Sequence, residues 1–121
     1  DDRGARALRG WGVRTVVTVT PDEKERTLAE RHGLELVELP FTRDSGCGPE
    51  VLDPFLKAVK ASDGPVYVHC IGGTHRAGAL CAYYRMKVEG WTFESAIEEY
   101  DRLGGDRVAD HALITAIRPK Q

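Results

Sequence analysis

The residues of this sequence that could do chemistry are concentrated in one short segment, which holds a cysteine and, six positions later, an arginine. Residues 66–78 read VYVHCIGGTHRAG. The thiolate of Cys70 would be a nucleophile, because helix N-termini and nearby cations lower a thiol pKa from about 8.5 to roughly 3.5–7.5. Arg76 offers two parallel N–H donors that match two oxygens of a phosphate group. The segment therefore predicts a nucleophile inside an oxyanion-binding loop.

The backbone of this loop should contribute as much as its side chains. A glycine-rich turn between a strand and a helix can direct several consecutive N–H groups at one point, and the helix adds its positive N-terminal end. The residues expected to bind the phosphate are Ile71, Gly72, Gly73, Thr74, His75 and Arg76. We expect Thr74 and His75 to face the mouth of the pocket and to influence the choice of substrate.

This segment resembles the signature of the cysteine-dependent protein tyrosine phosphatase superfamily. That signature is His-Cys, five residues and Arg, with a glycine as the third of the five, here Gly73. Rhodanese sulfurtransferases also carry a cysteine loop between strand and helix, but it is typically one residue shorter and too tight for a tetrahedral phosphate. The loop length favours a phosphate over a persulfide.

The resemblance covers nearly the whole chain and is greatest to compact dual-specificity phosphatases. It includes GVRTVV at 12–17, LPFTRD at 39–44, YRM at 84–86 and GW at 90–91. It implies one catalytic domain over residues 1–121. Members usually have a further strand or hairpin ahead of the first helix, so we expect such an N-terminal piece to be missing here.

Asp44 is the candidate general acid. A phosphate ester needs a proton on its leaving oxygen, and a carboxylic acid on a loop that can close over the pocket supplies it. Asp44 lies in a loop with proline and glycine, where the resembling family places its acid. Asp44 could instead cap a turn or the helix after Pro49, and Asp53 is the weaker alternative acid.

Other side chains near the segment have supporting or structural roles. His69 is expected to organise the loop backbone and favour the thiolate, as it does in the resembling family. Arg43 and Arg85 could add positive charge, although lone arginines are usually solvated. Cys47 and Cys81 could be oxidation partners of Cys70, with ordinary packing the better reading for Cys81.

One position departs from the family pattern. Members generally carry serine or threonine directly after the arginine, where the hydroxyl helps the cysteine to leave in the second chemical step. This chain has Ala77 there. The departure raises the alternative of a pseudophosphatase that binds phospho-ligands and turns over slowly.

Composition limits the range of partners. The chain has 121 residues, with 17 basic and 19 acidic residues and a net charge of -2, so it offers no general basic field for nucleic acid or an anionic membrane. The three cysteines fit reduced thiols in a cytoplasmic protein better than a disulfide framework. No cofactor is expected, and a metal site of His69, Cys70 and His75 is poor, because zinc takes ligands from well-separated elements. The oligomeric state is left open.

The pattern of strands and helices predicts an α/β fold, with a mainly parallel central sheet flanked by helices. Strands are expected at residues 13–19, 34–39 and 65–69, the last being central in the sheet. Helices are expected at 20–32, after 49, at 77–89, from 92 to 103 and at 106–117. Thr20 is the expected cap of the first of these helices and Gly33 its end. Cys70 then lies at the carboxyl edge of the sheet, where α/β proteins bind ligands.

These observations favour a phosphatase that hydrolyses phosphate monoesters through a phosphocysteine. The expected substrate is a phosphorylated protein, on tyrosine or on serine and threonine, or a small phosphate ester. The alternatives are the pseudophosphatase, an inositol or lipid phosphate phosphatase, and a rhodanese-like sulfurtransferase. The loop lacks lysine, which weakens the assignment to polyphosphoinositides.

Overall fold

The structure, a computed structural model, describes residues 2–42, 46–62, 64–69 and 75–119. Its sheet consists of β1 (Thr15–Thr18), β2 (Glu35–Glu38) and β3 (Val66–His69). All three strands are parallel and lie in the order β2-β1-β3. The predicted α/β class with a parallel sheet is confirmed.

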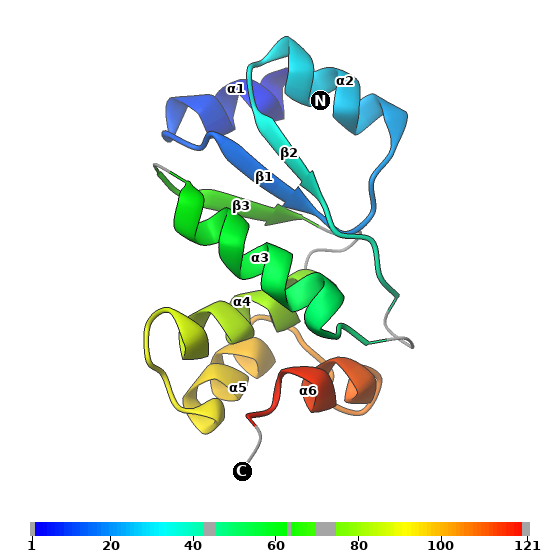
Figure 1. Cartoon of the computed structure of the whole chain (residues 1–121), viewed down its shortest axis with the longest axis vertical. Helices are drawn as coiled ribbons and strands as arrows, with labels where there is room; N and C mark the ends of the chain where they lie inside the picture. The colour runs from blue at the N-terminus through cyan, green and yellow to red at the C-terminus, as the bar shows by residue number, and fades with distance from the viewer. Residues whose placement is uncertain (1, 43–45, 63, 70–74, 120–121) are drawn as a thin grey trace.

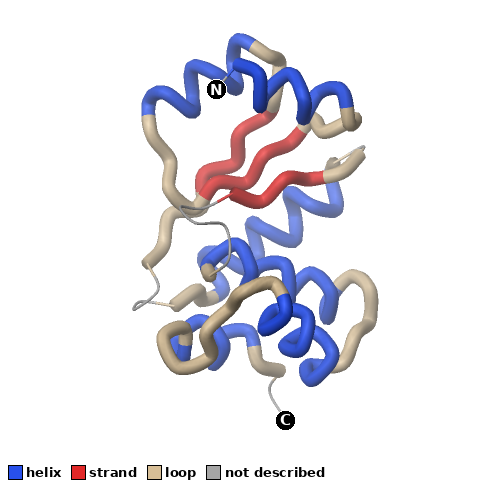
Figure 2. Tube along the Cα trace, turned by 180° about the vertical axis from the view of Figure 1, so that it is seen from behind, coloured by secondary structure: helices blue, strands red, loops and turns tan. Residues whose placement is uncertain are grey.

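Helices cover both faces of this sheet, as the opposite views in Figures 1 and 2 show. The helices are α1 (Asp2–Gly10), α2 (Glu23–Arg31), α3 (Pro49–Ala61), α4 (Arg76–Lys87), α5 (Phe93–Arg102) and α6 (His111–Ile117). α1 and α2 lie on one face, and α3 to α6 lie on the other. The apolar core is therefore divided into a small cluster around Val16 and a larger one around Val17, since consecutive side chains of β1 point to opposite faces.

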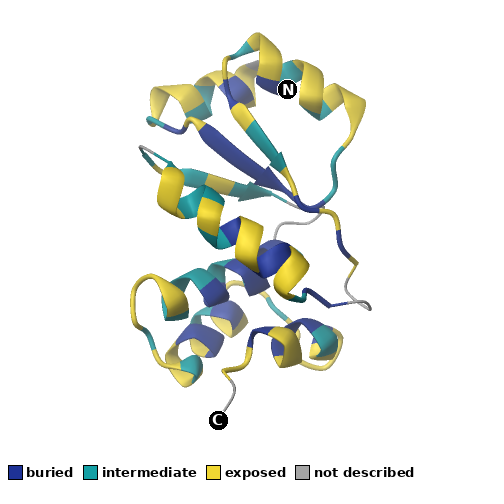
Figure 3. Cartoon of the chain, viewed as in Figure 1, coloured by how far each residue is buried: buried dark blue, intermediate teal, exposed yellow. Residues whose placement is uncertain are grey.

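The central strand of the described sheet is β1, so the prediction that the strand before the cysteine would be central is wrong for these residues. All four residues of β1 are buried, whereas β3 has no buried residue and Tyr67 is 43% exposed (Figure 3). The apolar letters of β3 resemble those of a central strand. Its position depends on pairing between distant segments, which local composition does not encode.

Two helix boundaries differ from the predictions because side chains cap the backbone elsewhere. Asp22, not Thr20, caps α2, and its Oδ1 accepts a hydrogen bond of 2.8 Å from the Glu25 N–H. The last helix begins at His111, because the Asp106 carboxylate accepts from the N–H groups of Val108 and Ala109 and forms a turn there. The predicted end of α2 at Gly33 is confirmed by its left-handed φ of +67°.

α4 packs deeply into the larger core. Its buried residues are Ala77, Ala79, Leu80, Ala82 and Tyr83. Val88, the C-cap residue, is 41% exposed. The small residues on this face let α5 approach closely, since a Cβ on Gly78 would lie 3.2 Å from the Tyr100 ring.

Across the described residues, none of the helices is both long enough and apolar enough to span a membrane.

Candidate active site

The candidate site lies at the carboxyl edge of the sheet. In the strand register, Thr18 of β1 is opposite both Glu38 of β2 and His69 of β3. β3 ends at His69, and α4 begins at Arg76. The structure thus shows the two anchors of the expected phosphate loop. The predictions for Cys70, Ile71, Gly72, Gly73 and Thr74, and those for Arg43 and Asp44, lie outside the described residues.

The anchor at the end of β3 is held by backbone and side-chain contacts. The carbonyl oxygen of His69 accepts a hydrogen bond of 3.1 Å from the N–H of Val19. Its Nε2 lies 3.8 Å from Oε1 of Glu25, and the other oxygen of Glu25 accepts from the hydroxyl of buried Thr18 at 3.1 Å. His69 is therefore positioned by α2 and β1, which fits an organising role better than proton transfer.

Arg76 connects the start of α4 to the segment that leads to the expected acid. Its Nη1 donates a hydrogen bond of 2.9 Å to the carbonyl oxygen of Phe41. Phe41 is buried in the larger core, three positions before Asp44 in the sequence. The contact therefore joins Arg76, which is predicted to bind the phosphate, to the segment that leads to the predicted acid.

His75, directly before Arg76, takes part in a polar cluster on the side where α5 and α6 meet α4. Its Nδ1 lies 2.6 Å from Oδ2 of Asp110, which is fully buried. The hydroxyl of Tyr100 donates to the same oxygen of Asp110. Burial, and then the hydrogen bond to Asp110, raise the pKa of Tyr100, so the phenol stays protonated as a donor.

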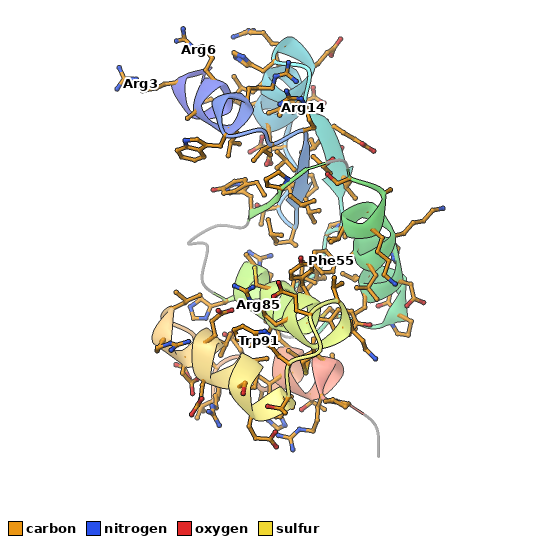
Figure 4. The ribbon with its side chains drawn as sticks, turned by 90° about the vertical axis from the view of Figure 1, so that its left-hand side faces the viewer. Arg3, Arg6, Arg14, Phe55, Arg85 and Trp91 are labelled. Atoms are coloured by element: carbon orange, nitrogen blue, oxygen red, sulfur yellow. The ribbon has the colours of Figure 1, made fainter. Side chains whose placement is uncertain are left out.

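Arg85 takes no part in this edge of the sheet. Its guanidinium donates to Glu99 at 3.0 Å, pairs with Glu89 and lies 4.8 Å above the ring of Trp91 (Figure 4). These contacts join α4, α5 and the turn between them. The suggestion that Arg85 adds charge at a phosphate site is therefore wrong, and its role is structural.

The remaining candidates differ in their surroundings. Cys47 is only 1% exposed, and burial followed by the charge of Glu50 raises the pKa of its thiol to about 11, so it is a poor thiolate. Cys81 is half-buried and lines a cavity of about 370 Å³ with Phe55. Asp53 is exposed on α3. No group of three potential metal ligands occurs within the part of the chain that the structure describes.

A family model covers most of the chain. Residues 2–111 match the model described as PTP-SAK, Swiss Army Knife protein, DSP-PTPase phosphatase domain. The chain belongs to this dual-specificity phosphatase family. The family resemblance carried by the His69-to-Arg76 segment is thereby confirmed.

Individual relatives and solved structures agree with this membership. The chain is 36% identical over 99 residues to the dual specificity protein phosphatase TpbA of Pseudomonas aeruginosa, covering 80% of this chain and 44% of TpbA. It is 32% identical over 123 residues to human protein tyrosine phosphatase type IVA 3, covering 94% of this chain and 69% of that protein. The crystal structure of P. aeruginosa TpbA in complex with pTyr superposes with a TM-score of 0.82 at 27% identity, covering 100% of this chain and 75% of that one. In the sequence comparison, the chain spans somewhat less than half the length of TpbA, at 44%.

Three groups that hold the anchors of the loop could not be identified from the sequence. These are the carboxylates of Glu25 and Asp110 and the carbonyl oxygen of Phe41. Asp110 had one visible signal, since an acidic residue directly before the apolar run of the last helix is a typical N-cap. Nothing in the sequence indicated that Asp110 would be buried or that it would pair with His75.

Proposed function

We propose that this chain is a phosphatase that hydrolyses phosphate monoesters through a phosphocysteine on Cys70. The observation that carries the proposal is the match of residues 2–111 to a phosphatase domain, because it spans both anchors of the loop and the predicted nucleophile. The fixed positions of His69 and Arg76 at the carboxyl edge of the sheet support it. They frame a loop of the length that suits a phosphate group.

The proposed reaction has two steps. The Cys70 thiolate attacks phosphorus and forms an S–P bond, while the ester P–O bond breaks and Asp44 protonates the leaving oxygen. Backbone N–H groups of residues 71–75 and the guanidinium of Arg76 stabilise the charge on the phosphoryl oxygens. A water, deprotonated by Asp44, then attacks phosphorus, and the S–P bond breaks to release phosphate and the thiolate.

The proposed substrate is a phosphorylated protein, with phosphotyrosine as the first candidate. The complex of TpbA with pTyr supports that choice, since TpbA is similar to this chain in sequence and fold. The proposed location is the cytoplasm, where a nucleophilic thiol stays reduced.

Turnover of an aryl phosphate by the purified chain tests the proposal. We expect release of phosphate by the wild type, no release by Cys70→Ser, and retained binding of the ester by Cys70→Ser, because the hydroxyl is a poor nucleophile in a pocket that keeps its donors. Arg76→Lys should also lose most activity, since a point charge cannot reproduce the paired geometry. A Cys70→Ser variant that turns over like the wild type would overturn the covalent mechanism.

A pseudophosphatase that binds phospho-ligands is the second candidate, and Ala77 is the residue that favours it. The same assay separates the two functions. A folded wild type that binds the ester tightly and releases no phosphate supports the second candidate. Phosphotyrosine, phosphoserine and phosphothreonine peptides, together with an inositol phosphate, then identify the preferred ligand.

A further inference from the structure

The polar cluster of His75, Asp110 and Tyr100 joins α4, α5 and α6 at the start of α4. His75 is the N-cap residue of α4, Asp110 is the N-cap residue of α6, and Tyr100 lies in the last turn of α5. The side chains of His75 and Tyr100 both contact Oδ2 of Asp110. One member of the cluster, His75, directly precedes Arg76 in the chain.

Asp110 is held in a single arrangement by its surroundings. A fully buried carboxylate is stable only when donors compensate its lost hydration. The His75 ring and the Tyr100 hydroxyl provide two donors to one oxygen. Removing either donor weakens the compensation of this buried charge, so each contact helps to keep the carboxylate in place.

Tyr100 itself has no room to move. Its hydroxyl accepts a hydrogen bond of 3.1 Å from the N–H of Asp106. Its ring lies so close to Gly78 of α4 and to Gly105 that a Cβ on Gly78 would lie 3.2 Å away and one on Gly105 would overlap the ring. Tyr100 therefore fixes Asp110 relative to the first turns of α4.

The contact with Asp110 determines the state of the His75 ring. A carboxylate only accepts hydrogen bonds, so Nδ1 of His75 must carry a proton, and Nε2 remains at the partly exposed side of the ring, whose side chain is 29% exposed. Neither the orientation of the ring nor its tautomer is free. The start of α4 is therefore held at two points. Asp110 fixes the side chain of His75, and the carbonyl oxygen of Phe41 fixes the guanidinium of Arg76.

We propose that Asp110 and Tyr100 are positioning residues for the phosphate loop, acting through His75 on the placement of Arg76. The inference rests on the proposed function and adds to it the elements that hold the loop in its working geometry. Neither residue is among those expected to bind the phosphate. Their effect is to keep the arginine donors where the charge of the transition state develops.

The test compares the kinetics of Asp110→Asn with those of the wild type on an aryl phosphate. The amide is the same size but can donate to Nδ1 of His75 as well as accept from it, so orientation and tautomer are no longer fixed. We expect kcat to fall about tenfold to hundredfold, as small misplacements of catalytic groups do, with KM much less affected. Tyr100→Phe, which keeps the ring and removes the hydroxyl, should lower kcat in the same direction.

Two controls separate positioning from general loss of structure. Asp106→Asn changes a carboxylate in the same turn that accepts from the N–H groups of Val108 and Ala109, and it should leave kcat unchanged. In a His75→Ala background, Asp110→Asn should cause no further loss of kcat, because its effect passes through the missing ring. Full additivity of the two changes, or an equal loss in Asp106→Asn, overturns the inference.

A spectroscopic readout keeps the inference testable apart from turnover. Nitrogen-15 NMR of the wild type should show the proton of neutral His75 on Nδ1, and Asp110→Leu should remove that preference. The absence of the Nδ1 signature in the wild type overturns the inference. A folded wild type without turnover overturns the proposed function and the catalytic part of the inference together, whereas an active wild type whose kcat is unchanged in Asp110→Asn overturns the inference alone.

Discussion

Ala77 occupies the position directly after the arginine, where the phosphatases that this chain resembles generally carry serine or threonine. It is 3% exposed and lies in the first turn of α4, directly after Arg76. In the proposed reaction, the Cys70 thiolate that departs in the second step would then lack one hydrogen-bond donor, because position 77 has no hydroxyl. We therefore expect the phosphocysteine to accumulate, and rapid mixing with an activated aryl phosphate to show a burst equal to the enzyme concentration.

Restoring the hydroxyl should reverse this behaviour. Ala77→Ser should raise steady-state turnover and shrink the burst, since a hydrogen bond to a charged group contributes on the order of 1.5–3 kcal/mol, or about tenfold to hundredfold in rate. Ala79→Ser is the matched control, because Ala79 is equally buried in the same helix. A missing burst, with no gain from Ala77→Ser, would show that another donor already serves the thiolate.

Asp44 is expected to set the alkaline limb of the pH profile. If it protonates the leaving group, the rate falls as Asp44 loses its proton, and Asp44→Asn should flatten that limb. The same variant should slow esters with poor leaving groups far more than those with good ones. Asp53→Asn is the comparison, since Asp53 is exposed on α3. The assignment is wrong if Asp53→Asn gives these effects and Asp44→Asn does not.

At the scale of elements, Tyr100 of α5 packs against two glycines, Gly78 of α4 and Gly105 in the segment after α5. A Cβ at position 105 would overlap a ring that is 2% exposed and hydrogen-bonded on its hydroxyl. Gly105→Ala should therefore lower the free energy of unfolding by about 1–3 kcal/mol, measured by urea denaturation. Gly10→Ala is the control, because a Cβ there meets nothing within 4 Å. Equal stability of the two variants would contradict this packing.

Arg85 tests whether charge near α4 matters for catalysis or only for structure. Its partners are Glu99, Glu89 and the Trp91 ring, all at the far end of α4 from Arg76. Arg85→Gln should therefore leave KM for an aryl phosphate unchanged. It should lower the free energy of unfolding by about 1 kcal/mol, since the ion pairs are only partly buried. A clear rise in KM would show that Arg85 does contribute charge at the phosphate site.

The elements themselves were largely predictable, because their signals are local. The β-branched run of β1, the apolar face of α3 and the glycine after α2 each mark an element within a few residues. The caps were less predictable: Thr20 and Asp22 are both good N-cap residues, and only the contact with the Glu25 N–H selects Asp22. The position of β3 in the sheet was not predictable, since it depends on which distant strands pair.

The whole molecule shows the same division between local and distant signals. The cysteine-to-arginine spacing identified the family because both residues belong to one short loop. The groups that hold that loop come from far along the chain: Glu25 for His69, Phe41 for Arg76 and Asp110 for His75. A sequence marks such residues only as charged or apolar, and folding decides which of them meet.

The buried thiol of Cys47 links the stability of the whole domain to pH. Burial and the charge of Glu50 raise its pKa from 9.0 to about 11. The unfolded chain loses this proton at lower pH than the native chain, so the stabilisation is complete below pH 9 and is lost as the pH rises towards 11. The loss should amount to roughly 3 kcal/mol.

Urea denaturation at a series of pH values from neutral to strongly alkaline measures this loss. The raised pKa values of Tyr83 and Tyr100 act in the same direction at the alkaline end of the series, so the thiol must be separated from the phenols. Cys47→Ala does this, because it removes the thiol and leaves both tyrosines in place. The variant should be less stable at neutral pH, where it has lost packing, and its stability should fall less steeply than that of the wild type as the thiol range is crossed. Parallel curves for the two proteins would mean that Cys47 ionises as readily in the native state as in the unfolded chain, and its assignment as an inert core thiol would then be wrong.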